Sequence, residues 1–241
     1  VDRRQRQMCI RDRNNIKVTA LTRNIHQKGY ILKTQANPGY LEIVEGSIFD
    51  HELIEKLFID ADLCVNLIGI LFEKGKNNFN NIHVEFPKMI SRYASTCKLK
   101  KFVHLSALGI ENAKDSIYAQ SKLKGEEEIL NNFDKAVIVR PSIVYSVDDN
   151  FTTQLMTLLG LLPIFPIYYN GKTKFRPIFC SDLTNSITKI ITDDIEENII
   201  EFVGPEEMSF KEILEKLLSL IEKKRLLLPM PISLARMTAH I

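Results

Sequence analysis

Three side chains of this sequence have the types and spacing of a proton-transfer site. Tyr118 and Lys122 lie four residues apart in a stretch predicted to be helical, so both fall on one helix face. A nearby ammonium group favours phenolate, which would let Tyr118 exchange protons with a hydroxyl or carbonyl group near neutral pH. Ser106 ends a predicted strand shortly before this helix. A Tyr-x-x-x-Lys pattern also occurs by chance on solvated helices, and that alternative stays open.

Metal and thiol chemistry are not predicted. The five histidines show no metal-ligand spacing: they are His26, His51, His83, His104 and His240. His104, inside a predicted strand, is interpreted as a core residue with its hydrogen bonds satisfied. The four cysteines lie far apart without a C-x-x-C pair: they are Cys9, Cys64, Cys97 and Cys180. This usage indicates a reduced, intracellular protein.

The elements that must position the candidate site alternate between strand and helix. Apolar and β-branched runs predict strands, and three- and four-residue apolar spacing predicts helices. The predicted strands are 16–22, 41–45, 62–69, 101–106 and 136–140, and the predicted helices are 52–58, 79–97 and 117–132. Pro87 lies inside the second helix and is expected to kink it. This alternation predicts an α/β fold with a doubly wound parallel sheet of Rossmann type.

The pattern becomes less regular after Pro141. The sequence predicts helices at 151–162 and 182–192, strands at 174–180 and 199–203, and a proline-interrupted loop from 163 to 171. Ser209 and Glu212 form a capping box that opens a last helix. We therefore expect a truncated dinucleotide-binding domain over residues 14–145. A substrate or partner lobe over 146–241 would be interleaved with the sheet and lie over the carboxyl ends of its strands.

Composition excludes several classes of protein. The chain has 241 residues, of which 45% are hydrophobic and 26% charged, and its formal net charge is +2. These values are typical of a soluble globular protein and do not favour nucleic-acid binding through bulk charge. The most apolar stretch, 155–169, is interrupted by Gly160, Pro163 and Pro166, so no transmembrane span is predicted.

The first thirteen residues differ from the rest. Five of the eleven arginines fall in residues 1–13, which contain no lysine. A transit peptide and a nucleic-acid-binding arm are alternatives, but Asp2 and Asp12 and the short length disfavour the transit peptide. We interpret residues 1–13 as a non-native or disordered leader.

Several strings together resemble the short-chain dehydrogenase/reductase superfamily. The similarity is greatest to its atypical, epimerase-like branch, which contains the nucleotide-binding accessory subunit of respiratory complex I and its bacterial relatives. The resemblance runs from Asn14 to the C-terminus. Its strings are 65–70, 103–109, Tyr118 and Lys122 with Gly125 and Glu126, 140–145, 148–151, 202–205 and 228–231.

The resemblance implies a site for NADP(H) or NAD(H). Arg23 would face the adenosine ribose, where an arginine suits a 2′-phosphate and hence NADP(H), although a solvated surface arginine is the alternative. The other implied cofactor residues are Ser47 and Ile48 near adenine, Asn66, Leu67, Ile68 and Gly69 near ribose, Ser106, Tyr118 and Lys122, and Pro141, Ser142 and Ile143 near nicotinamide. Asp50 is expected to cap the following helix.

One departure from the family concerns the phosphate site. The family begins with a strand and a glycine-rich turn that binds the pyrophosphate. The first glycine here is Gly29, beyond the family's second strand, so the phosphate loop is absent from this chain. We expect the family's first strand and helix to be missing, and the C-terminus to stop short of the family's usual end.

The resemblance implies three alternative functions. The first is a complex I accessory-subunit relative with a structural or redox-sensing cofactor and complex I subunits as partners. It would be cytoplasmic in a bacterium, with peripheral membrane association, or in the mitochondrial matrix of a eukaryote. The second is an active oxidoreductase or epimerase that uses Tyr118, Lys122 and Ser106 on a nucleotide-linked sugar or quinone-like carbonyl. Ala107 and Leu108 replace polar residues common in sugar-modifying relatives and disfavour turnover. The third is an interaction module without a nucleotide. The apolar stretch 226–232 could contact a partner or a membrane surface, but packing within the core or the lobe is the favoured interpretation.

Overall fold

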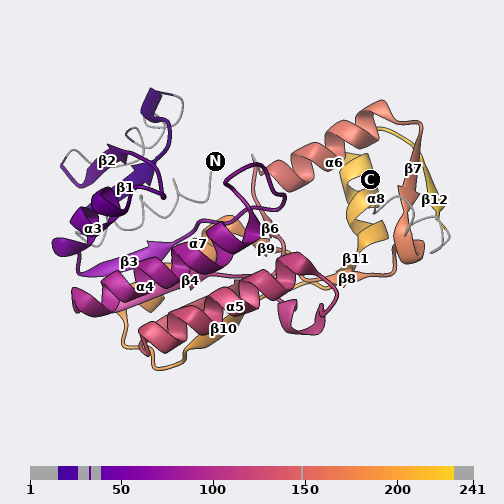
Figure 1. Ribbon diagram of the computed structural model, residues 1–241. Helices are drawn as coiled ribbons and strands as arrows, with labels where there is room; N and C mark the ends of the chain where they lie inside the picture. Colours follow the sequence, from indigo (N-terminus) through magenta and orange to yellow (C-terminus); the bar gives the residue numbers. More distant parts are fainter. Residues whose placement is uncertain (1–15, 27–32, 34–38, 148, 231–241) are drawn as a thin grey trace. The chain divides into compact units, whose positions relative to one another are not determined.

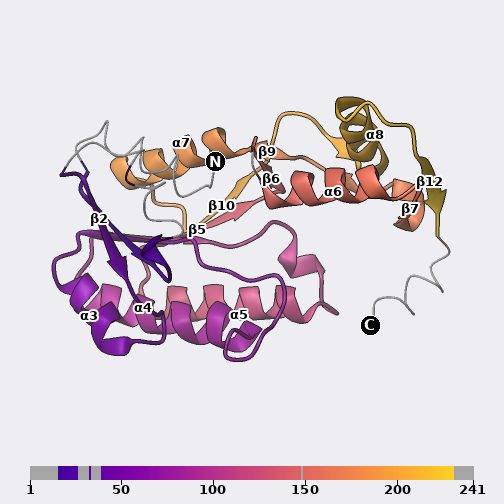
Figure 2. The ribbon, with the colours of Figure 1, turned by 90° about the horizontal axis from the view of Figure 1, so that it is seen from above.

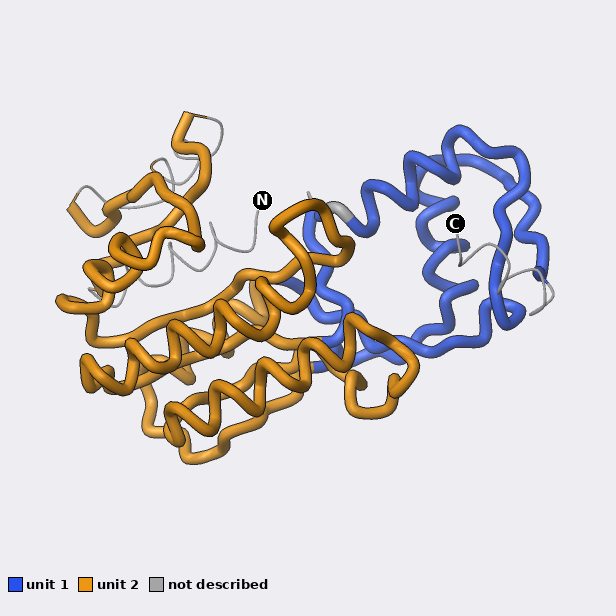
Figure 3. Tube along the Cα trace, in the orientation of Figure 1, with its two compact units in different colours: residues 1–2, 142–180, 203–241 blue, residues 3–141, 181–202 orange. Residues whose placement is uncertain are grey.

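The computed structural model describes residues 16–26, 33, 39–147 and 149–230. The chain divides into two compact units, coloured separately in Figure 3. The sheet unit lies within residues 3–141 and 181–202, and the lobe unit lies within 142–180 and 203–241.

The sheet unit is built from parallel strands. A two-stranded sheet pairs β1 with β2, and a four-stranded sheet has the order β10-β5-β4-β3. The bounds are β1 Val18–Thr22, β2 Leu41–Glu45, β3 Leu63–Asn66, β4 Lys101–Leu105, β5 Ala136–Pro141 and β10 Ile199–Phe202. The predicted parallel α/β fold is confirmed.

Helices cover both faces of the four-stranded sheet. Figure 2 shows α4 and α5 on one face and α7 on the other, as expected for a parallel sheet buried on both sides. The bounds are α3 His51–Ile59, α4 Phe86–Thr96, α5 Ile117–Asn132 and α7 Cys180–Thr192, with a short 3₁₀-helix at Ile110–Asn112. Hydroxyl and carboxylate caps fix two of their starts, because Asp50 accepts from Leu53 N–H and Ser116 accepts from Ala119 N–H.

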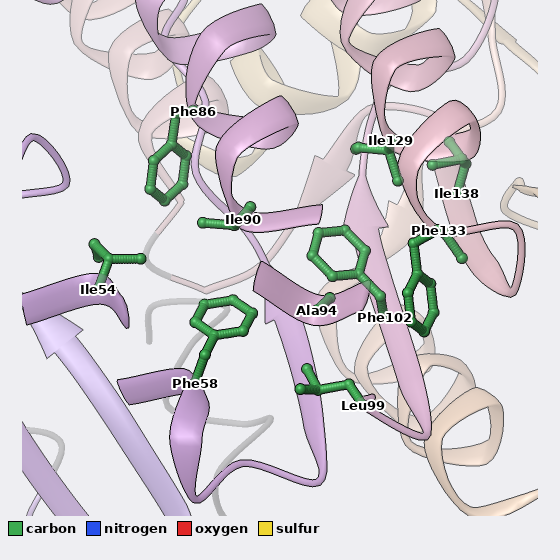
Figure 4. Close-up of a cluster of buried hydrophobic side chains, with 11 residues drawn as sticks. Ile54, Phe58, Phe86, Ile90, Ala94, Leu99, Phe102, Ile129, Phe133 and Ile138 are labelled. Carbon is green, nitrogen blue, oxygen red and sulfur yellow. The ribbon is translucent and has the colours of Figure 1, made fainter. Parts of the chain in front are cut away.

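The main core lies between the sheet and the helices α3, α4 and α5. Figure 4 shows its aromatic and aliphatic side chains facing one another. Phe102 of β4 and Ile138 of β5 are fully buried in this cluster. Strand side chains alternate between faces, so His104 lies on the same face of β4 as Phe102.

The helix before β4 differs from the prediction. A single kinked helix was expected from 79 to 97, whereas the structure has a π-helix at Asn80–Glu85 that leads into α4. Pro87 has no N–H to give to the His83 carbonyl group four residues earlier, and it lies in the first turn of α4, where such a loss is tolerated. The π-helical turn accommodates a proline that an uninterrupted α-helix would not.

The lobe unit packs two helices against short strands, as Figure 1 labels them. Parallel β7 and β12 form one pair, parallel β6 and β9 a second, and antiparallel β8 and β11 a third. The bounds are β6 Val144–Tyr145, α6 Asn150–Leu161, β7 Ile164–Ile167, a 3₁₀-helix at Tyr168–Gly171, β8 Lys174–Phe175, β9 Ile178–Phe179, β11 Met208–Ser209, α8 Phe210–Leu220 and β12 Leu226–Pro229. The predicted capping box at Ser209 and Glu212 is present.

Two predictions in this unit were wrong. The loop expected from 163 to 171 contains β7, whose partner strand is the apolar stretch that begins at Leu226. Pro166 is tolerated because a two-stranded sheet needs its N–H groups on one side only. The strand expected at 174–180 is two short strands with Pro177 between them.

Candidate functional site

Helix α5 and strand β4 bring the predicted proton-transfer residues together. Tyr118 and Lys122 lie one turn apart on α5, and Lys122 Nζ donates a hydrogen bond of 3.2 Å to the Leu105 carbonyl oxygen. Leu105 is the last residue of β4, and Ser106 follows it with 7% of its surface exposed. The carboxyl end of a parallel strand is where doubly wound folds bind ligands.

Burial changes the acidity of Lys122. Its side chain is 4% exposed, and this desolvation lowers the pKa of Lys122 to about 8, against the opposing charge of Glu126. Glu126, one turn further along α5, is bonded by Arg140, with Nη2 2.6 Å and Nε 3.1 Å from its two oxygens. This bidentate pair joins α5 to β5 and occupies both oxygens of the carboxylate, so Lys122 lies close to a negative charge without bonding to it.

His83, which the sequence interpretation left unused, is a central residue of the site. Its Nε2 accepts from the Ile70 backbone N–H at 3.1 Å, so the proton of the neutral ring is on Nδ1 and is donated to Ser121 Oγ at 2.9 Å. Ser121 donates in turn to the Tyr118 carbonyl oxygen at 2.7 Å. Burial and, secondly, the Lys122 charge lower the pKa of His83 to about 4, which keeps this tautomer neutral.

Two aromatic rings, those of Phe79 and His83, contact the Tyr118 side chain. The His83 ring stacks on Phe79 with centroids 5.3 Å apart, and Tyr118 meets both rings edge to face at 5.3 Å and 5.8 Å. Such edge-to-face pairs stabilise one ring orientation. The four-residue spacing of Phe79 and His83 is the sequence signal that would have indicated this cluster.

Two glycines permit the close approach of backbone segments. A Cβ atom on Gly125 would lie 1.8 Å from the His83 carbonyl oxygen, so only glycine lets α5 pack on the π-helix at this distance. A Cβ atom on Gly69 would lie 3.2 Å from Lys122 Nζ. Gly125 belongs to the string with Tyr118, Lys122 and Glu126 that resembles the family. The close approach of the His83 carbonyl oxygen explains why a glycine is needed at this position.

The interpretation of His104 as a fully satisfied core residue was half right. His104 is buried, and its Nδ1 lies 2.9 Å from Asn66 Nδ2, its register partner on β3. His104 Nε2 and Ser106 Oγ are buried without a hydrogen-bond partner in the described part of the chain. Asn66 Oδ1 accepts from Ile68 N–H at 3.0 Å, so this predicted cofactor residue also holds the loop after β3. Leu67 and Ile68 are half-buried there, and Gly69 is exposed.

The residues implied for adenosine follow the two-stranded sheet. Arg23 is exposed and comes directly after β1. Ser47 follows β2 and accepts from Phe49 N–H at 3.1 Å, while Ile48 packs against the main core. These positions are at the carboxyl ends of parallel strands, where a dinucleotide site requires them.

The residues implied for nicotinamide are divided between the units. Pro141 ends β5, and its carbonyl oxygen accepts from Leu108 N–H at 3.0 Å, which holds the loop after Ser106 beside this strand. Ser142 and Ile143 belong to the lobe unit, where the Ile143 carbonyl oxygen accepts from Ile178 N–H.

Neither a metal site nor a membrane span is found among the described residues. No group of three or more histidine, cysteine, aspartate or glutamate side chains is placed there to hold a metal ion. Each helix in that part of the chain is too short or too polar to cross a bilayer.

A parallel sheet with a Tyr-x-x-x-Lys helix beside the end of an inner strand defines an α/β fold of Rossmann type. The solved structures with this fold include UDP-glucuronic acid 4-epimerase from Bacillus cereus, solved with UDP-glucuronic acid and NAD. It is 19% identical with a TM-score of 0.74, covering 93% of this chain and 82% of that one. The dTDP-4-dehydrorhamnose reductase from Bacillus anthracis, solved with NADP, is 17% identical with a TM-score of 0.70, covering 89% and 84%.

The particular relatives are accessory subunits of respiratory complex I. The mitochondrial NADH dehydrogenase (ubiquinone) 1 alpha subcomplex subunit 9 of Mus musculus is 23% identical over 202 residues, which are 83% of this chain and 54% of the relative. The chain thus spans about half the length of that relative. No family model matches the chain. The chain is similar in sequence to this complex I subunit and shares the fold of the epimerase and the reductase above, as the sequence predicted.

Proposed function

We propose that this chain is the dinucleotide-binding part of a complex I accessory-subunit relative, with a bound NADP(H) or NAD(H) in a structural or redox-sensing role. The observation that carries the proposal is the buried Lys122 ammonium at the carboxyl end of β4. One of its three N–H donors bonds to the Leu105 carbonyl oxygen. The other two are available to the hydroxyl groups of the nicotinamide ribose. Hydrogen bonds to these hydroxyl groups would compensate the cost of burying the positive charge of Lys122.

The residues around Lys122 fit such a group. Gly69 gives the Lys122 ammonium open space on one side, and Pro141 would approach the nicotinamide through its backbone. Arg23 would select NADP(H), since a guanidinium group binds a 2′-phosphate in a bidentate manner. When bound, the cofactor supplies hydride-transfer chemistry. The apolar Ala107 and Leu108 beside Ser106 favour a bound cofactor without rapid turnover.

The test is the affinity for NADPH and NADH, measured by calorimetry on this chain and on the full-length product of its gene. Lys122→Met should weaken NADPH binding at least tenfold, because two hydrogen bonds to ribose are lost, each worth about 1 kcal/mol. Lys124→Met, an exposed lysine on the same helix, is the matched control and should change nothing. Arg23→Asp should reduce or reverse the preference for NADPH. A full-length protein that binds neither dinucleotide would refute the proposal and favour the interaction module.

A second candidate function is an active NADP-dependent oxidoreductase or epimerase acting on a nucleotide-linked sugar or a quinone-like carbonyl. The observation in its favour is that Tyr118 and Lys122 share one face of α5 and that Lys122 bonds to the carbonyl oxygen of Leu105, the residue before the buried Ser106. In this case Tyr118→Phe should leave NADPH affinity nearly intact and remove NADPH oxidation with candidate carbonyl substrates. In the structural case the parent protein itself shows no such oxidation.

The proposed location follows from the relatives. In a eukaryote it would be the mitochondrial matrix, and in a bacterium it would be the cytoplasm, with peripheral association at the inner membrane through complex I subunits. Co-purification of the tagged full-length protein with complex I subunits from its native source tests this partner. Recovery without them under mild detergent would exclude a stable association.

A further inference from the structure

Two buried polar atoms, one on strand β4 and one on the residue that follows this strand, have unmet hydrogen-bonding capacity. His104 is 1% exposed and Ser106 is 7% exposed, and neither His104 Nε2 nor Ser106 Oγ has a partner among the described residues. The Ser106 N–H still bonds to the Val139 carbonyl oxygen of β5, so the alternation of β4 continues past Leu105 and puts the Ser106 and His104 side chains on one face of the sheet. Unsatisfied buried groups of this kind are rare in folded proteins and call for an explanation.

The proton of His104 can be assigned from its neighbours. Asn66 Oδ1 accepts from Ile68 N–H, so the other end of this amide, Nδ2, faces His104 Nδ1 as a donor at 2.9 Å. Nδ1 is therefore an acceptor, and a neutral ring carries its proton on Nε2. Burial, followed by the charges of Lys122 and His83, lowers the pKa of His104 well below its usual range, so the ring is neutral. His104 Nε2–H is thus an obligatory donor without an acceptor in the described chain.

We propose that His104 is a positioning residue that orients the Ser106 hydroxyl through one buried water molecule. His104 Nε2–H donates to the water, and the water donates to Ser106 Oγ. A single water satisfies both groups because it accepts and donates, and buried waters commonly occupy such polar positions. The Ser106 hydroxyl hydrogen is then available to donate a hydrogen bond to another acceptor.

This arrangement assigns a polarity to Ser106. With its oxygen already accepting from the water, Ser106 acts as a donor, and its partner at the end of β4 is an acceptor such as a carbonyl or carboxamide oxygen. This last step rests on the proposed function, since it needs a ligand at that place. The relay from Asn66 through His104 to Ser106 does not need one.

The relay is tested by ¹⁵N NMR of histidine-labelled protein without dinucleotide. The parent should show His104 as the Nε2–H tautomer, with slow exchange of that proton. Ser106→Ala removes the second partner of the water and should speed the exchange at least tenfold, while Ser106→Thr, which keeps the hydroxyl, should restore it. Ser95→Ala, an exposed serine on α4, is the matched control and should leave the rate unchanged. A His104 proton on Nδ1, or equal exchange rates in parent and Ser106→Ala, would overturn the proposal.

A second measurement covers the case in which Ser106→Ala does not fold. A high-resolution crystal structure of the parent should contain one water within hydrogen-bond distance of both His104 Nε2 and Ser106 Oγ. A direct hydrogen bond between these two atoms, or the absence of a water between them, would overturn the proposal. Titration with NADPH separates the two claims. A protein that shows the relay but binds no dinucleotide refutes only the proposed function, and one that binds NADPH without the relay refutes only this inference.

Discussion

Replacing Gly125 with alanine tests the close packing of α5 on the π-helix. The added Cβ atom would lie 1.8 Å from the His83 carbonyl oxygen, and the next nearest atom, the His83 carbonyl carbon, would be 3.0 Å away. Carbon–oxygen contacts of this type are normally at about 3.3 Å or more, so the two backbones must separate by about 1.5 Å. Both are main-chain segments of helices, and neither has a flexible end that can swing aside.

The expected magnitude is the balance of two effects. Overpacking of this kind costs about 1–3 kcal/mol, and the main-chain contact puts Gly125 at the upper end. Alanine in a helix interior is favoured over glycine by about 1 kcal/mol. The net expectation is that Gly125→Ala lowers the free energy of unfolding by about 2 kcal/mol.

The assay is urea unfolding of parent and variants, followed by circular dichroism. Gly160→Ala on α6 is the matched control, because the added Cβ atom would make only an ordinary van der Waals contact, with Lys223 Nζ at 3.8 Å. There only the helix preference acts, and stability should rise by up to about 1 kcal/mol. If Gly125→Ala is as stable as the parent, the proposed steric requirement is refuted.

Two further predictions concern charged groups of the sheet unit. Arg140→Met should lower the free energy of unfolding in urea by about 3–5 kcal/mol, because it leaves the Glu126 carboxylate buried without its partner. The double variant Arg140→Met with Glu126→Leu should recover most of this loss. A double variant no more stable than the single one would contradict this reasoning. For Lys122, the pKa lowered to about 8 in the folded chain means that the unfolded chain binds more protons between pH 8 and pH 10.5. The free energy of unfolding of the parent should therefore rise with pH over that range, by on the order of 3 kcal/mol relative to Lys122→Met. If the free energies of the two proteins change with pH in parallel, Lys122 is not desolvated.

Local signals account for the parts of the fold that the sequence predicted well. The limits of α5 agree with the helix predicted over 117–132, and the structure adds the Ser116 cap that fixes its start. The parallel strands were predicted because their runs are short, rich in apolar and β-branched residues, and separated by helical segments. β7 was missed because Pro163 and Pro166 suggested a loop, and its partner strand lies some sixty residues away in the sequence. Pairing at that distance depends on tertiary contacts that no local pattern contains.

The candidate site was predictable only in part for the same reason. The spacing of Tyr118 and Lys122 places them on one helix face, and this requires no tertiary information. The contact of Asn66 with His104 depends on the register of β3 against β4, which brings the two residues opposite each other. The role of His83 depends on Ile70 and Ser121, which come from a loop and a different helix. His104 lies inside the string 103–109, but that string gives no indication of its contact with Asn66, and His83 lies outside all the strings that resemble the family.

The division of the chain between its two units has a consequence for folding during synthesis. The chain leaves the sheet unit after Pro141, returns at Ser181 and leaves again after Phe202. β10 pairs with β5, so the four-stranded sheet cannot be completed until residue 202 has emerged from the ribosome. Until then one edge of β5 and the face of the sheet that α7 covers remain open to chaperones and to other nascent chains. A ribosome stalled between residues 141 and 199 would therefore present an aggregation-prone intermediate, although most of the sheet unit has already been made.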